Sequence, residues 1–482
     1  MKKTYFLPLV VLSAFTFASC GNNNPEPVQL TLVSEWGSFN DEYPTPKMTL
    51  NAMKSQKLSE VKGLIEPKPF FPDVHTFSGW AFDAQGTKRV DKDYVIDGNV
   101  TLYANYERKK EVKESYILYN YNSNSSVEET VDRNVVKFEY EGELTEGDVE
   151  ATPIKESKPN IVYSNNNTVT ITYQDELPTY GPSLITIKKP IDNLRLSDGI
   201  GSLSYPLGNQ FITAVLLNDG ATKVDDYAFY GCAWLMAISL PDTIKTIGTD
   251  AFTLCYSLNS FEVPKALKEI PYEAFYGCAT MEHVYFNEGL EKIGSRSFFG
   301  CASLKEIHIP DSVTTLGAEA FNFCLTNNDL RIGRGINVIP DRCFASNYYL
   351  QKVTIPNTIS ELGSACFQYC DSLTEVVFED GGDIKIEETD KINAPFQYCI
   401  SLSKIKFPSR FKTMGNSTFQ HTMLYELDLT SSDTIVSFGM NSLGQDTPLN
   451  YNYGKIIVPN NLVDAYKGAE GWKDHASIIV GQ

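Results

Sequence analysis

Residues 228–255, AFYGCAWLMAISLPDTIKTIGTDAFTLC, begin and end on one pattern: alanine and phenylalanine, two variable residues, and a cysteine. The phenylalanine recurs along the chain at a fixed spacing. It stands 23 residues apart at Phe229, Phe252, Phe275, Phe298, Phe321, Phe344 and Phe367, then at Phe396 after 29 residues and at Phe419 after another 23. A period of this length predicts a repeat architecture in which each repeat is one supersecondary unit.

The complete repeat reads L-x-x-I-x-I-P-x-x-I-x-x-I-G-x-x-A-F-x-x-C. Its I-x-I segment predicts a short strand with two inward-facing apolar residues, because side chains alternate along a strand. Both inward columns are apolar in ten successive repeats, the first from Val215 to Leu427 and the second from Leu217 to Leu429. One such strand cannot bury its apolar side alone, so stacked rungs must share a core. We therefore expect a mainly β solenoid of about ten 23-residue rungs over residues 201–460.

A cysteine column follows the phenylalanines three positions later. It contains Cys232, Cys255, Cys278, Cys301, Cys324, Cys370 and Cys399, with Asn347 and Thr422 in the two other repeats. Side chains of neighbouring rungs point in parallel, which leaves their Cβ atoms poorly placed for a disulfide. We expect free thiols that fill the core as small, weakly polar groups. The group most open to a bridge is Cys343, Cys366 and Cys370, because two of its members replace the usual alanine.

This unit resembles the leucine-rich repeat of BspA-like proteins over about 250 residues. The seventh rung departs from the pattern by six extra residues near EDGGDIKIEETD. Residues 461–482 resemble the helical C-terminal cap of such proteins, with Leu462, Tyr466 and Trp472 covering the last open core. The resemblance implies a non-catalytic role in adhesion to host proteins, other cells or surface glycans.

Two further segments precede the solenoid. Residues 28–108 contain TFSGWAFD and NVTLYANYE, which resemble the internalin B-repeat module, a small β-grasp-like unit of bacterial surface proteins. The resemblance rests on Phe77, Gly79, Trp80, Leu102, Tyr103, Ala104 and Tyr106. We expect Trp80 in the core of this module rather than at a ligand. Residues 109–200 carry strand-like segments separated by Asn- and Ser-rich turns, which favours a β-rich, sandwich-like spacer domain.

The N-terminus carries a targeting pattern. Two lysines precede an apolar run of 13 residues, which is too short to span a membrane as a helix. The run ends in Phe-Ala-Ser-Cys at residues 17–20, which resembles the lipobox of bacterial lipoproteins. The resemblance implies that residues 1–20 contain a signal peptide, that the sulfur of Cys20 is lipidated, and that residues 21–27 form a tether. A plain secretory signal is the alternative.

Charge and motifs restrict the class of function. The formal net charge of −19 argues against nucleic acid as a partner, because phosphate binding needs clustered Lys and Arg. The sequence contains no paired C-x-x-C, no H-E-x-x-H and no G-x-S-x-G. We therefore expect no enzyme, no catalytic residue, no cofactor and no metal. We also expect a monomer.

The outward-facing residues of the strands form two polar columns. On rungs four to six of the repeat array these columns hold the candidate ligand-binding residues His283, Tyr285, Glu306, His308, Asp329 and Arg331. Three interpretations remain open: a solvated sheet face with cross-strand charge pairs, a contact patch for a protein or glycan, and an opportunistic Zn²⁺ site. An aromatic ring beside Arg and His is typical of binding hot spots. The acidic insert at residues 379–390 offers Ca²⁺ ligands, although a solvated loop is the simpler interpretation.

Together these features favour a lipoprotein anchored to a bacterial membrane by its lipid and exposed at the cell surface. We expect it to bind a host extracellular protein or a surface glycan. The alternative is a structural cell-envelope protein whose solenoid is a stiff display element without a specific ligand. Solenoid faces bind too many kinds of partner for the ligand to follow from the fold.

The lipidation hypothesis predicts the behaviour of Cys20→Ser. Without the sulfur, no diacylglyceryl group can be attached, so the precursor should stay uncut or the protein should be released from the membrane. Metabolic labelling with a fatty acid and detergent partitioning measure both effects. Membrane retention equal to that of the wild type would contradict the hypothesis.

Overall fold

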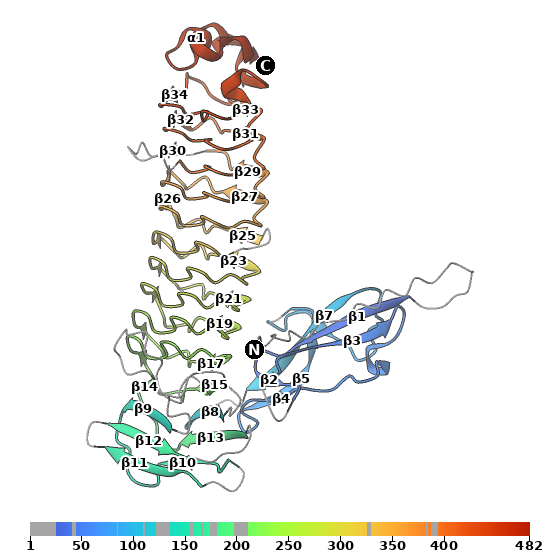
Figure 1. Cartoon of the computed structure of the whole chain (residues 1–482), viewed down its shortest axis with the longest axis vertical. Coiled ribbons are helices and arrows are strands. Elements are labelled where there is room, and N and C mark those ends of the chain that lie inside the picture. The colour runs from blue at the N-terminus through green and yellow to red at the C-terminus, as the bar shows by residue number, and fades with distance from the viewer. Residues whose placement is uncertain are drawn as a thin grey trace, which may run out of the picture.

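The computed structural model describes residues 26–40, 45–83, 85–108, 111–121, 135–154, 158–164, 167–173, 181–196, 211–324, 329–381, 384–386 and 394–482. Figure 1 shows a long upright solenoid with a helical end at the top, two small sheets at its base, and a separate module beside its lower rungs. Cys20 and half of the acidic insert, residues 382, 383 and 387–390, lie outside the described residues. The predicted mainly β solenoid is confirmed.

The main face of the solenoid is a stack of short parallel strands. They are β15 (Ile212–Leu216), β17 (Ala237–Ser239), β19 (Ser260–Glu262), β21 (His283–Tyr285), β23 (Glu306–His308), β25 (Asp329–Arg331), β27 (Lys352–Ile355), β29 (Glu375–Phe378), β31 (Lys404–Lys406), β33 (Glu426–Asp428) and β35 (Lys455–Val458). The register follows the 23-residue period, so that Ser260 lies opposite His283 and Glu306 opposite Asp329. Strand β35 adds one rung to the ten that the apolar columns predict.

A second column of shorter strands closes each rung. It comprises β16 (Lys223–Val224), β18 (Thr246–Ile247), β20 (Glu269–Ile270), β22 (Lys292–Ile293), β24 (Thr315–Leu316), β26 (Val338–Ile339), β28 (Glu361–Leu362), β30 (Ile384–Ile386), β32 (Phe411–Met414) and β34 (Ser437–Phe438). The glycine that follows these strands permits a close approach between rungs. A Cβ on Gly317 would lie 2.1 Å from the backbone nitrogen of Ser295 in the preceding rung. Any larger residue there would therefore force two rungs apart.

The phenylalanine column forms a continuous stack of rings inside the solenoid. The centroids of Phe275 and Phe298 lie 5.2 Å apart and their rings are parallel within 3°. Phe298 and Phe321 repeat the same spacing. The neighbouring inward columns are buried except at Leu240, Phe286 and Phe378, which are half-buried. The predicted phase of the repeat is therefore confirmed.

The cysteine column is a column of hydrogen-bond donors as well as a filler of space. The Sγ of Cys255 lies 3.2 Å from the backbone oxygen of Phe229 in the preceding rung. The same contact recurs at Cys278, Cys301, Cys324, Cys370 and Cys399. Asn347 substitutes for cysteine because its Nδ2 donates to the oxygen of Phe321 at 2.9 Å. The nine cysteines from Cys232 to Cys399 are free and buried, and burial raises the pKa of the thiol of Cys301, so it stays a donor.

The rung that carries the acidic insert is bridged by a buried arginine. Arg410 is only 3% exposed. Its Nη1 donates to the oxygens of Asn357 at 2.8 Å and Ile359 at 2.9 Å, and its Nη2 to the oxygen of Pro356 at 3.1 Å. The guanidinium thus connects two rungs on either side of the irregular one.

Two sheets at the base cover the first rung. One sheet has the order β10 (Val149–Ala151), β13 (Gly181–Ile187), β8 (Ser115–Tyr121), β15 and β17, and the other has β11 (Asn160–Ser164), β12 (Thr168–Thr172), β9 (Val135–Glu141) and β14 (Asn193–Arg195). Their inner faces and the solenoid interior form one core that runs from Ile117 to Ile479. The sandwich-like segment is therefore continuous with the solenoid, since β8 pairs directly with β15.

The C-terminal segment covers the opposite end. It contains η4 (Asn460–Leu462), α1 (Val463–Gly468), η5 (Lys473–Ile478) and β36 (Ile479–Gly481), and it follows η3 (Leu449–Tyr451). Tyr466 and Trp472 are fully buried, as the sequence predicts, and the indole Nε1 donates to the oxygen of Val436 at 2.8 Å. Within the described ranges, no helix has the length and apolar character needed to cross a membrane.

The N-terminal module is a mixed sheet of order β3 (Lys47–Met53), β1 (Pro27–Val33), β7 (Val100–Arg108), β5 (His75–Ala81) and β6 (Arg89–Val90). The central pair β1–β7 is parallel and its neighbours are antiparallel, which is a β-grasp-like arrangement. A single 3-10 turn, η1 (Leu58–Glu60), follows β3 in the chain. The short strand β2 (Gly37–Ser38) pairs with β4 (Lys68–Pro69). Trp80 is buried in the core of this module, as predicted.

The ring stack predicts a large effect of Phe298→Ala. Removing a fully buried ring between two others should lower the free energy of unfolding by about 3–5 kcal/mol. Urea unfolding measures this loss, and Phe323→Ala is the control because Phe323 is 40% exposed. Equal losses in the two variants would show that the stack does not stabilise the solenoid.

Candidate ligand-binding cleft

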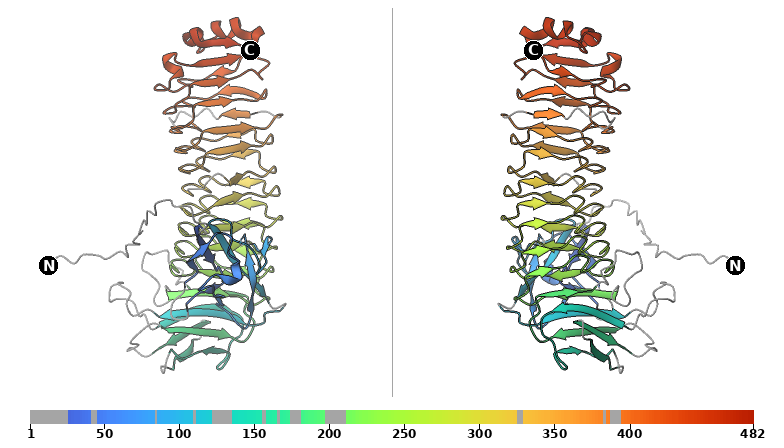
Figure 2. Two further views of the ribbon diagram at one scale, coloured as in Figure 1. Left: turned by 90° about the vertical axis from the view of Figure 1, so that its right-hand side faces the viewer. Right: turned by 90° about the vertical axis from the view of Figure 1, so that its left-hand side faces the viewer.

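The N-terminal module packs against the strand face of the lower rungs. Figure 2 shows it in front of this face when the molecule is turned by 90°. A small apolar cluster joins Phe70, Phe71 and Val74 of the module to Ala214 and Ala237 of the solenoid. The outward residues of the first rungs are small, which lets the module approach the strands closely.

Polar contacts extend this boundary along the next rungs. The Oγ of Ser260 donates to a carboxylate oxygen of Glu35 at 3.0 Å. The ring of Tyr103 lies edge-on to His283 with centroids 5.9 Å apart, and the Nζ of Lys305 lies 3.4 Å from the Tyr103 hydroxyl. The module therefore reaches the rung of His283, and the strand face there is not simply solvated.

This docking places the predicted ligand-binding residues in different environments. His283 is buried, Tyr285, Glu306 and His308 are half-buried, and Arg331 is exposed. These five line one pocket. The sixth, Asp329, belongs to β25 by its backbone, but its side chain lies outside the described set.

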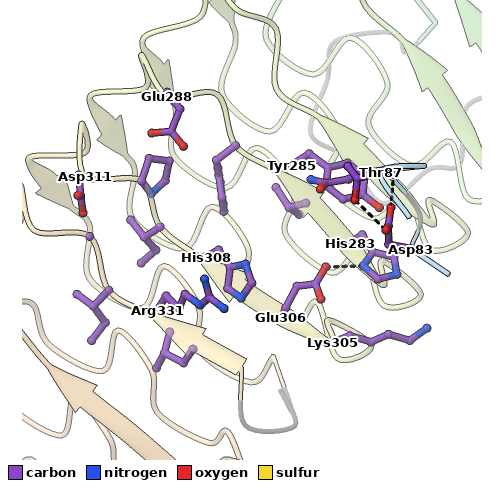
Figure 3. A pocket seen from close by; sticks show the side chains of 18 of the residues that line it. Asp83, Thr87, His283, Tyr285, Glu288, Lys305, Glu306, His308, Asp311 and Arg331 are labelled. Carbon is purple, nitrogen blue, oxygen red and sulfur yellow. Dashed lines mark hydrogen bonds and ion pairs between the residues drawn. The ribbon is translucent and has the colours of Figure 1, made fainter. Parts of the chain in front are cut away.

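The pocket lies between the module and the solenoid and has a volume of about 880 Å³. The module contributes the β5–β6 connection, including Asp83, Gln85 and Thr87, which the sequence analysis did not single out. Figure 3 shows Asp83, Thr87, His283 and Tyr285 at one end of the pocket, with Glu288 and Asp311 at the other. The site is thus composite, with walls from two parts of the chain.

Two buried polar atoms at this end have no hydrogen-bond partner among the described residues: the Nε2 of His283 and the hydroxyl of Tyr285. The other ring nitrogen of His283, Nδ1, lies 2.8 Å from a carboxylate oxygen of Glu306. The His283 and Tyr285 rings stack with centroids 5.9 Å apart. Burial, and then the nearby carboxylate of Glu35, raise the pKa of Tyr285, so its hydroxyl keeps its proton. The arrangement offers a fixed hydrogen-bond donor and a ring nitrogen to a ligand.

The loop on the module side is held by its own hydrogen bonds. A carboxylate of Asp83 accepts from the backbone nitrogen of Thr87 at 2.7 Å, from its hydroxyl at 2.8 Å, and from the nitrogen of Lys88 at 2.9 Å. Burial alone would raise the pKa of Asp83, but these hydrogen bonds bring it below its ordinary value. Asp83 therefore stays ionised and shapes the loop, and Gln85 is left exposed at its tip.

A second pocket of about 840 Å³ continues on the other side of this loop. Its lining includes Trp36, His75 and Asn105 from the module and Asp242 from the solenoid. Burial, with a contribution from the charge of Arg108, lowers the pKa of His75 to about 4, so this histidine is neutral at physiological pH.

Among the side chains that the structure describes, no group of three or more His, Cys, Asp or Glu is arranged to hold a metal ion. Hydrogen bonding and ring contacts are the chemistry that both pockets provide.

The sequence of the rungs identifies the family. A profile of the BspA type leucine-rich repeat region matches residues 204–327, 268–389, 319–442 and 384–464, which together exceed half of the 482 residues. The chain belongs to the BspA-type leucine-rich repeat family. A comparison with curated protein sequences gives no match.

Several solved structures are similar to this BspA-type chain. A leucine-rich repeat protein from Bacteroides ovatus is 21% identical, with 62% of this chain and 69% of that one covered and a TM-score of 0.43. A leucine-rich cell surface protein from Faecalibacterium prausnitzii is 20% identical, with coverages of 62% and 98% and a TM-score of 0.31. The pneumococcal vaccine antigen PcpA is 17% identical, with coverages of 65% and 82% and a TM-score of 0.36.

The buried carboxylate of Glu35 makes the docking of the module in this BspA-type protein pH-dependent. Burial raises the pKa of Glu35 above its ordinary value of 4.5. The docked state therefore holds the proton more tightly, and docking weakens as the pH rises from 4.5 through the raised pKa.

Glu35→Gln should consequently raise the melting temperature of the module at pH 7, and the difference from the wild type should shrink as the medium is acidified toward pH 4. Scanning calorimetry at both pH values checks this. Glu66→Gln is the control, because Glu66 is exposed on the same module. A lower melting temperature for Glu35→Gln at neutral pH would contradict the argument.

Proposed function

We propose that this chain is a non-catalytic binding protein of the bacterial cell surface, anchored by a lipid on Cys20. It holds a host extracellular protein or a surface glycan in the cleft between module and solenoid. The observation that carries the proposal is a pair of buried polar atoms that have no hydrogen-bond partner in the described part of the chain, the Nε2 of His283 and the hydroxyl of Tyr285, in a pocket with walls from both parts.

Buried polar groups without hydrogen bonds are rare in folded proteins, and each costs about 1–3 kcal/mol of desolvation. A ligand that hydrogen-bonds to both would recover that cost on binding. The exposed guanidinium of Arg331 and the ring of Tyr285 add the residue types that recur at binding hot spots.

Location and partner class rest on other features. The targeting pattern that ends at Cys20 supports export and anchoring, and membership of the BspA-type family supports a surface role in binding. The net charge of −19 makes nucleic acid an unsuitable partner. We propose that a single chain forms the site, since both walls of the cleft belong to it.

A second candidate is a structural role, with the solenoid as a stiff display element. The continuous core from Ile117 to Ile479 favours it, because a single core without a break transmits strain along the whole rod. This role does not require the composite cleft. The two candidates therefore differ in whether changes in the cleft affect binding.

Screening residues 21–482 against arrays of host extracellular proteins and glycans provides the ligand for the test. Arg331→Ala should then weaken binding by at least about 1 kcal/mol, as expected for a hot-spot residue, and leave the melting curve unchanged. Tyr285→Phe should also weaken binding without loss of stability, because the hydroxyl that it removes has no described partner in the free protein. Lys404→Ala is the control, an exposed basic residue on the same face three rungs further. Wild-type binding by the Arg331→Ala, Tyr285→Phe double variant would place the partner elsewhere.

A further inference from the structure

We propose that the cleft binds a neutral oligosaccharide chain that lies along the solenoid axis, with the described residues of the module loop, 82, 83 and 85–88, as one of its walls. This inference rests on the proposed function and specifies its ligand. It assigns a role to residues of the N-terminal module, above all Gln85, that lie outside the repeat.

The two pockets form one elongated cleft. Both are lined by Gln85, Thr87 and Tyr285, which therefore stand at the waist where the pockets meet. One pocket extends from this waist to Thr354 on β27, and the other extends to Asp219 just after β15. Because neighbouring rungs stack about 4.8 Å apart, the cleft follows the axis over several rungs. Such a shape suits a chain molecule rather than a compact one.

The cleft carries charges of both signs, and several of them are already paired within the protein. Arg334 contacts Glu379 at 2.6 Å, Lys265 contacts Asp242 at 2.5 Å, and Arg108 contacts Asp219 at 2.7 Å. Lys305 is likewise paired with Glu282. A strongly acidic or basic ligand would have to break these pairs. A neutral ligand leaves them in place and uses the remaining acceptor and donor capacity of their side chains.

Hydroxyl groups match the atoms that remain without partners. The hydroxyl of Tyr285 and the Nε2 of His283 lie at the waist or beside it, and His283 is only 6% exposed. A sugar hydroxyl donates and accepts at once, so it can satisfy either atom. The apolar faces of a pyranose ring can also pack on the aromatic rings of the cleft, among them Trp36 and Tyr103. The cleft therefore supplies both kinds of contact that a sugar needs.

A polypeptide fits the same surface less well. Extended peptides usually bind by adding a strand to a free sheet edge. The strand β21 beneath the waist lies within the parallel stack, paired with β19 on one side and next to β23 on the other, so it presents no such edge.

The test uses the full mature chain and an array of neutral oligosaccharides that runs from monosaccharides to hexasaccharides, with acidic glycans and host proteins printed beside them. Titration of the best neutral series, followed by tryptophan fluorescence, then gives affinity against chain length. We expect affinity to rise at least tenfold from the monosaccharide to a plateau. Gln85→Ala should lower the affinity for the longest chain at least threefold and flatten the dependence on length. Gln29→Ala, an exposed glutamine of the same module away from the cleft, should leave both unchanged.

Three results would overturn the inference. If only proteins or acidic glycans bind, and Arg331→Ala weakens that binding, the neutral-sugar ligand is wrong while the proposed function stands. If neutral sugars bind but Gln85→Ala behaves like Gln29→Ala, the module loop is not part of the site. If nothing on the arrays binds, the inference and the proposed function fail together.

Discussion

The stacking of one phenylalanine ring on the next is the contact on which the rest of the molecule depends. Ring centroids 5.2 Å apart on either side of Phe298 match the spacing that parallel strands impose, so the backbone ladder and the ring ladder reinforce each other. Every rung needs a neighbour to cover its ring. The base sheets and the C-terminal segment follow from this need, since each end of the stack would otherwise expose apolar side chains to water.

The repeat made most of the solenoid predictable from sequence. The phase of the inward columns, the burial of Phe298 and the free thiols all follow from a 23-residue period and the alternation of side chains in a strand. The burial of Trp472 follows instead from the resemblance of residues 461–482 to the C-terminal cap of BspA-like proteins. The extra rung at β35 was harder to predict, because its strand follows the preceding one after 29 residues instead of 23. The hydrogen bonds of the cysteines were also missed, although Asn347 in the same column indicates that the position favours a donor.

The composite cleft could be predicted only in part. The polar residues from His283 to Arg331 were visible as outward columns, but the module that partly covers them is linked by contacts between residues about 200 positions apart, such as Lys305 and Tyr103. The 23-residue period does not predict contacts between the module and the solenoid, because the module lies outside the repeat. One signal was present in the repeat itself: the outward column starts with Ala214, Ala237 and Ser260, and small residues on a strand face permit another part of the chain to pack there.

The buried thiols have a consequence for how such a chain survives outside the cytoplasm. In the folded solenoid the nine cysteines are buried, and burial raises the pKa of the Cys301 thiol, so neither thiol–disulfide exchange nor peroxide finds a thiolate to attack there. If the chain is exported as we propose, the same nine cysteines are accessible in an oxidising compartment before the chain folds. An exported chain of this kind must therefore close its rungs faster than its sulfurs are oxidised, and the speed of coil formation protects it in place of cross-links.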